Sequence, residues 1–121
     1  MPQTVMIVDD ALFIRTVLRN MLEDCGYHTI AEAGTALEAQ RYLHTISPDL
    51  IFLDIILPDA NGIEILDDIR CSLPTTKVII CSSISQEQTI QKALQHGAAA
   101  YLQKPFTQET VAAVLRQMEA S

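Results

Sequence analysis

Residues 51–62 read IFLDIILPDANG, and this stretch decides the fold class of the 121-residue chain. Asp54 lies inside an otherwise apolar run that covers residues 50–57. An unpaired carboxylate in a protein core is costly, so it is expected to be neutralised or to find partners. Either the run is not a buried strand, or Asp54 lies where the strand emerges at a polar edge. In the second case a loop follows, and Gly62 gives it freedom before the next helix.

Apolar, β-branched runs recur along the chain and alternate with helical patterns. The predicted strands cover residues 4–8, 28–33, 50–53, 77–81 and 98–103. The predicted helices cover residues 11–26, 35–46, 62–73, 85–97 and 107–120. Such alternation predicts an α/β fold, in which right-handed crossovers join parallel strands and helices cover both faces. The run at 28–33 is the weaker, more polar kind that is typical of an edge strand.

Several helix ends carry capping signals. Ser85 is the predicted N-cap of the fourth helix, and Gly26 and Gly97 are the predicted stops of the first and fourth helices. Thr107 followed by Thr110 gives only part of a capping pattern at the fifth helix.

Length and composition narrow the class of protein. A chain of this length suits one compact domain over residues 1–121, and 49% hydrophobic residues are enough for a core. The formal net charge of −7 disfavours direct binding to nucleic acid. We expect a cytoplasmic protein, because no apolar run approaches the roughly 20 residues of a membrane span and no signal peptide is recognisable. The three cysteines form no CxxC pair, which fits a reducing compartment.

Polar residues terminate four of the predicted strands. In an open parallel sheet the carboxyl ends of the strands meet at one edge, where ligands bind. We therefore expect the residues at these ends to lie close together, and they are Asp9, Asp10, Asp54, Ser82, Ser83, Lys104 and Pro105.

These residue types suit phosphoryl transfer onto an aspartate. Three gathered carboxylates repel one another, and a hard divalent cation such as Mg²⁺ relieves the repulsion. Lys104 and Ser82 can contact an incoming anion. Asp54 stands alone at the end of the central strand, so it is the predicted phosphoacceptor, whereas Asp9 and Asp10 suit metal ligation. Taken alone, the acidic pair is an ordinary helix-capping signal, and the prediction rests on the joint placement of all these residues.

Four segments, VMIVDD, LIFLDIILPDANG, VIICSS and GAAAYLQKPF, occur in an order that resembles the response-regulator receiver domain over essentially the whole chain. The resemblance implies a flavodoxin-like (CheY-like), doubly wound sheet of five parallel strands in the order 2-1-3-4-5, with five helices on both faces. It also implies a histidine kinase as phosphodonor. VDDALFIRTVLRNML together with CSSIS is most similar to the single-domain chemotaxis CheY-type subgroup.

The same resemblance implies roles for individual residues. Mg²⁺ would be held by Asp9, Asp10, Asp54 and the backbone carbonyl of Ile56.

Ser82 and Tyr101 occupy the positions of the family's switch residues. The Lys104–Pro105 peptide bond is expected to be cis. Before proline the cis isomer is only about 0.5–1 kcal/mol less stable than the trans isomer.

The implied function is that of a phosphorylated switch rather than a multiple-turnover enzyme. Phosphorylation would alter the face formed by residues 85–97, 98–103 and 107–120 and so control a downstream protein, for which the flagellar motor switch is one candidate. Ile56 and Ile84 are apolar and cannot orient an attacking water. We therefore expect slow self-dephosphorylation and dependence on a separate phosphatase.

Three alternatives stay open. The chain could be the receiver of a longer regulator with an output domain, for example a transcriptional regulator. A haloacid-dehalogenase-type phosphatase also uses an aspartyl phosphate, but it needs a second Asp where this chain has Ile56. A degenerate receiver that acts only as a binding module is the third alternative.

Overall fold

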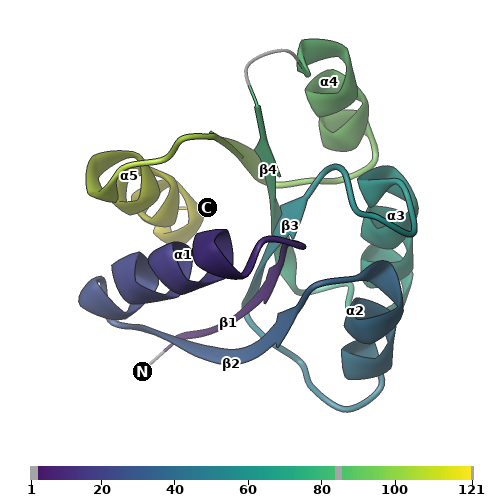
Figure 1. The fold of residues 1–121 in the computed structure, drawn as a ribbon, viewed down its shortest axis with the longest axis horizontal. Helices are drawn as coiled ribbons and strands as arrows, with labels where there is room; N and C mark the ends of the chain where they lie inside the picture. Colours follow the sequence, from purple (N-terminus) through teal and green to yellow (C-terminus); the bar gives the residue numbers. More distant parts are fainter. Residues whose placement is uncertain (1–2, 84–85, 121) are drawn as a thin grey trace.

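The computed structural model describes residues 3–83 and 86–120, in which five strands and five helices alternate without exception (Figure 1). In chain order the elements are β1 (Gln3–Val8), α1 (Leu12–Asp24), β2 (Tyr27–Ala33), α2 (Ala36–Leu43), β3 (Leu50–Asp54), α3 (Gly62–Ser72), β4 (Lys77–Ser82), α4 (Glu87–Gln95), β5 (Ala100–Gln103) and α5 (Gln108–Glu119). Every predicted strand and helix is present, with boundaries that differ by a few residues.

The five strands form one parallel sheet in the order β2-β1-β3-β4-β5. Helices α1 and α5 cover one face of this sheet, and α2, α3 and α4 cover the other (Figure 1). This arrangement confirms the predicted doubly wound, flavodoxin-like fold. It also places β1 and β3 side by side in the middle of the sheet, so that the residues following them meet at its carboxyl edge.

Strand β3 is buried on both sides, which explains its unbroken apolar sequence. Ile51 and Leu53 contribute to the core beneath α2 and α3, whereas Leu50 and Phe52 contribute to the core beneath α1 and α5. All five residues of β3 are buried, including Asp54. The strand therefore holds its last residue rigidly, with core packing on both faces.

The edge position of β2 confirms the prediction from its more polar sequence. His28 and Ile30 on this strand are exposed. The register with β1 shifts by one residue between Val5 and Met6, which interrupts the regular ladder at this edge.

The end of the opening stretch corrects one prediction. Gly62 is the first residue of α3, and its φ is not in the left-handed region. Its N–H donates to the Ile55 carbonyl at 2.8 Å, and a Cβ atom at this position would lie 2.6 Å from that oxygen. Glycine is therefore needed here for a close backbone approach, not for conformational freedom. Asn61 caps α3 by accepting the Ile63 N–H at 2.8 Å.

The predicted stops of α1 and α4 are confirmed. Gly26 and Gly97 have φ values of 88° and 102°, as glycines that stop helices commonly do. Thr107 and Thr110 form a complete capping box, where the sequence indicated only part of one. The predicted N-cap Ser85 lies outside the described residues. Over residues 3–83 and 86–120, none of the helices has the length and apolar character needed to cross a bilayer.

Candidate functional site

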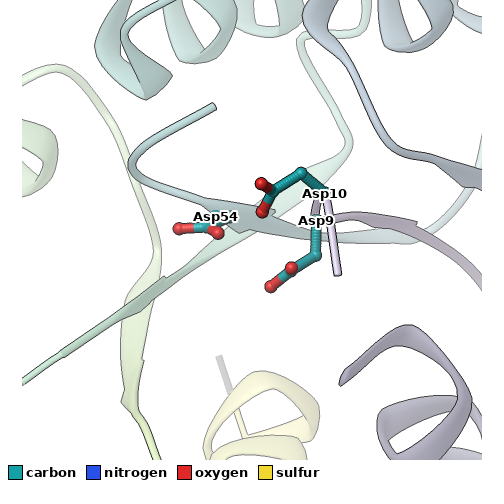
Figure 2. Close-up of side chains that lie close together, drawn as sticks. All are labelled: Asp9, Asp10 and Asp54. Carbon is teal, nitrogen blue, oxygen red and sulfur yellow. The ribbon is translucent and has the colours of Figure 1, made fainter. Parts of the chain in front are cut away.

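Three aspartates converge at the carboxyl edge of the sheet (Figure 2). Asp9 and Asp10 follow β1, and Asp54 ends the neighbouring strand β3. One carboxylate oxygen from each lies within 4.8 Å of the other two. Asp9 and Asp54 are only 3% and 8% exposed, whereas Asp10 is exposed. The convergence predicted from the strand ends is thus present in the folded chain.

Lys104 lies between two of these carboxylates. Its Nζ atom donates to Asp9 Oδ2 at 2.7 Å and to Asp54 Oδ2 at 3.1 Å. Its backbone N–H donates to the Ser82 carbonyl at 2.6 Å, which fixes the segment after β5 against the end of β4. The peptide bond between Lys104 and Pro105 is cis, the isomer that the sequence resemblance implies.

Burial and charge compete at Asp54. Burial raises the pKa of its carboxyl group, and the nearby Asp9 carboxylate adds to the increase. The Ile56 N–H, which donates to Asp54 Oδ1 at 3.1 Å, and the Lys104 ammonium both lower the pKa of Asp54.

Burial alone would lower the pKa of Lys104, but its bonds and attraction to Asp9 and Asp54 outweigh burial and raise that pKa. The lysine therefore stays charged beside the acidic cluster.

Ser82 contributes a buried hydroxyl group at the end of β4, the strand beside β3. It follows Cys81, which is the register partner of Asp54 across β3 and β4. Ser82 is 1% exposed, and its Oγ atom has no hydrogen-bond partner within the described part of the chain. Because buried polar groups are nearly always paired, an unpaired hydroxyl at this place suits a site that binds an anion.

Tyr101 lies farther out, on β5, and is 50% exposed. It lines a surface pocket of about 470 Å³ between α4 and β5 together with Ser83, Ile90 and Gln91. The structure thus places Tyr101 beside the strand end that carries Ser82, but not among the acidic residues.

The donor set of the cluster fits Mg²⁺. All three side chains offer carboxylate oxygens, the ligands that hard cations prefer, and Mg²⁺ is commonly held by one or two carboxylates with water and phosphate oxygens. The negative charge of three carboxylates is only partly balanced by Lys104. The predicted ligand role of the Ile56 carbonyl stays a prediction.

Asp59 and Arg15 also support the site. Neither residue ends a strand, so the argument from the strand ends did not reveal them. The carboxylate of Asp59 accepts the Ala36 and Leu37 N–H groups at 2.8 and 3.1 Å, which ties the loop after β3 to the start of α2. Arg15 donates from Nη1 to the Asp9 carbonyl at 2.6 Å. Arg15 lies within the predicted helix 11–26, and nothing in the local sequence pattern distinguishes it from a solvated arginine. Asp59 was visible as an acidic residue in a loop, but its partners lie 22 and 23 residues away.

Comparisons with known proteins agree with this geometry. The family profile described as "Response regulator receiver domain" matches residues 5–116. The chemotaxis protein CheY of Listeria monocytogenes is 37% identical over 93% of this chain and 94% of its own length.

Solved structures show the same fold. The chemotaxis response regulator CheY4 of Vibrio cholerae superposes with a TM-score of 0.87 at 26% identity, covering 98% of this chain and 99% of that one. NtrX of Brucella abortus superposes with a TM-score of 0.91 at 30% identity, and the match covers 99% of this chain but only 28% of NtrX. Because the profile spans almost the whole chain and the acidic cluster lies where the fold places its ligand site, this protein belongs to the response-regulator receiver family of two-component signal transduction.

Proposed function

We propose that this receiver accepts a phosphoryl group on Asp54 from the phosphohistidine of a histidine kinase. The observation that supports the proposal most directly is the position of Asp54. It is a buried carboxylate at the rigid end of the central strand, bonded to Lys104 and within reach of Asp9 and Asp10. A receiver as such implies a kinase and a downstream target, and the identity of both belongs to the proposal.

In the proposed reaction an Asp54 oxygen attacks phosphorus, a P–O bond forms, and the P–N bond to the donor histidine breaks. Asp54 must be ionised to attack, and Lys104 favours the ionised form against the effect of burial. Lys104 then exchanges its bond to Asp54 for one to a phosphoryl oxygen, and the Ser82 hydroxyl donates to another. Mg²⁺ would be held by Asp9, Asp10, Asp54 and the Ile56 carbonyl. When bound, it would neutralise charge on the transferring group.

The reaction is proposed to occur once per chain, so the protein acts as a switch and not as a multiple-turnover enzyme. A new phosphate adds charge and acceptor atoms beside Ser82, and this shifts an equilibrium between two conformations. Tyr101, half exposed at the pocket between α4 and β5, is positioned to respond. The face formed by α4, β5 and α5 is the proposed contact surface for the target.

Chemotaxis is the proposed pathway, with the flagellar motor switch as the candidate target. The support is similarity to CheY proteins across nearly their full length. A second function, as the receiver of a longer regulator, is favoured by the match to NtrX, in which the matched part is 28% of the chain. Capture of partners with and without beryllofluoride, a mimic of the phosphoryl group, distinguishes a motor protein from an output domain.

Phosphorylation by acetyl phosphate and Mg²⁺ tests the proposed role of Asp54. The wild-type chain should gain one phosphate, measured as a mass increase of the intact protein, and Asp54→Asn should gain none. Asp68→Asn is the matched control, because Asp68 is exposed on α3 and, within residues 3–83 and 86–120, its carboxylate bonds only to Gln40. Uptake at the wild-type level by Asp54→Asn would refute the proposal. Repeated turnover of a phosphomonoester would instead favour the dehalogenase-type phosphatase.

The persistence of the phosphate gives a further prediction. Ile56 is 62% exposed and lies two residues beyond Asp54, where its apolar side chain cannot orient a water molecule. Ile56→Asn should therefore speed phosphate loss by about tenfold, which corresponds to about 1.4 kcal/mol of barrier. Ile56→Val serves as the control. Ile84→Glu is predicted to add to the effect, although Ile84 lies outside the described residues. An unchanged rate in the Asn/Glu double variant would contradict this prediction.

A further inference from the structure

In the part of the chain that the structure describes, four hydrogen bonds fix Asp9, two at its backbone and two at its carboxylate. Its N–H donates to the Ala33 carbonyl at 2.9 Å, and its own carbonyl accepts from Arg15 Nη1 at 2.6 Å. Its carboxylate accepts the Ala11 N–H at 2.9 Å and the Lys104 ammonium at 2.7 Å. The Arg15 bond reaches Asp9 from α1, the helix that directly follows the acidic pair.

Arg15 is itself held in place by Glu32 on β2. Arg15 Nε donates to Glu32 Oε1 at 3.2 Å, and Arg19, one helical turn farther along α1, pairs with the other Glu32 oxygen. The side chains of Arg15 and Glu32 are only 17% and 21% exposed. Gly34 leaves room for the guanidinium group, since a Cβ atom there would lie 3.2 Å from Arg15 Nη1.

We propose that Arg15 is a positioning residue for the Mg²⁺ site, an inference that rests on the proposed function. Its guanidinium group spans from Glu32 to the Asp9 carbonyl and so fixes the turn that presents Asp9 and Asp10 to the metal. A lysine cannot replace it, because a single ammonium group lacks the planar fork that places two donors on separate acceptors. Outer residues that orient metal ligands typically change metal affinity by about 10- to 100-fold when they are mutated.

Charge by itself predicts the opposite effect. A cation near a metal site repels Mg²⁺, so a purely electrostatic role for Arg15 means that its removal strengthens binding. Arg15→Lys keeps the charge and removes only the fork, and it therefore isolates the positioning effect. Arg19→Lys is the matched control, because Arg19 makes the other bond to Glu32 but is found in no bond with Asp9.

The test measures Mg²⁺ affinity of the unphosphorylated full chain by isothermal titration calorimetry, with circular dichroism to verify folding. Arg15→Lys should weaken binding by about tenfold and Arg19→Lys by less than about twofold. Equal affinities for Arg15→Lys and the wild-type protein, or equal losses in both variants, would overturn the assignment. If Arg15→Lys does not fold, Arg15→Met removes both the fork and the charge, and a Mg²⁺ affinity equal to or higher than that of the wild type in that variant overturns the assignment as well.

Failure of the proposed function gives a different result. If the wild-type chain binds no Mg²⁺, the metal site itself is refuted and the role of Arg15 with it. If the wild-type chain binds Mg²⁺ and Arg15→Lys binds it equally well, only the role of Arg15 is refuted.

Discussion

Replacing Gly62 with alanine should destabilise the protein through a clash of backbone atoms. The new Cβ atom would lie 2.6 Å from the Ile55 carbonyl oxygen, 2.7 Å from its Cα and 2.8 Å from its carbonyl carbon. These atoms belong to the residue that follows the buried strand β3, so no side-chain rotation relieves the overlap. Ordinary contact begins at 3.4 Å, so the Ile55 oxygen would have to move about 0.8 Å away from the new Cβ atom. A displacement of that size would stretch the 2.8 Å bond from the Gly62 N–H to the Ile55 carbonyl beyond hydrogen-bond range.

The size of this destabilisation follows from two unfavourable effects of the new methyl group and one favourable effect of alanine. Overpacking of a filled core costs about 1–3 kcal/mol, and a buried carbonyl that loses its donor costs about 1–3 kcal/mol more. Alanine offsets up to about 1 kcal/mol, because it favours the helix and restricts the unfolded chain. The expected decrease in the free energy of unfolding of Gly62→Ala is therefore about 1–6 kcal/mol, with about 3 kcal/mol in the middle of the range.

Urea unfolding followed by far-ultraviolet circular dichroism measures this change, and the slope of the transition should stay the same. Gly34→Ala is the matched control. The nearest atom to its new Cβ is the end of the Arg15 side chain at 3.2 Å, which can move, so its stability should change by less than about 1 kcal/mol. A loss below about 1 kcal/mol in Gly62→Ala, or equal losses in both variants, would refute the reasoning.

Three other predictions concern charge and protonation. Lys104→Met leaves the nearly buried carboxylates of Asp9 and Asp54 without their cation. The free energy of unfolding in metal-free neutral buffer should therefore fall by about 2–4 kcal/mol, and Mg²⁺ should restore part of it. Equal urea midpoints for the variant and the wild type would contradict this prediction. Two backbone amides of α2 lower the pKa of Asp59, so its stabilisation is complete above the ordinary value of about 3.9 and is lost as the pH falls through the lower folded value. Asp59→Asn should therefore be less stable than the wild type at neutral pH, with a gap that narrows in acid; a gap independent of pH would count against it. Burial is the main cause, and the bond to Glu119 the second, that raises the pKa of Tyr27 to about 12. An ultraviolet titration should therefore show a phenol that ionises near this pH, and Glu119→Gln should lower that pKa. A titration unaffected by the substitution would show that Glu119 has no part in the shift.

The local patterns of the sequence were sufficient to predict the strands and helices and their order along the chain. Apolar runs and helical periodicity depend on neighbours within a few residues, so each strand and helix could be predicted from its own segment. Parallel winding then brings the strand ends to one edge, which is why Asp9, Asp10 and Asp54 could be predicted to meet.

The same argument brings Lys104 to Asp9, although the two residues are 95 positions apart. Contacts of residues that end no strand could not be predicted in this way, and the bond between Asp59 and Ala36, 23 residues apart, is one of them. The position of Arg15 in its helix is equally compatible with an arginine that faces solvent. Only the packing of α1 against β2 brings its side chain to Glu32 and the Asp9 carbonyl.

The sequence by itself predicted that Asp54 ends a strand buried on both sides, because a carboxylate within an apolar run is costly unless it lies where the strand emerges. Only the tertiary structure decided how that carboxylate is held. Its burial raises its pKa, Lys104 opposes the increase, and the close approach of Gly62 to Ile55 fixes the chain just after it. These features depend on side chains and backbone atoms that meet only when the sheet and its helices have packed, so no local pattern encodes them.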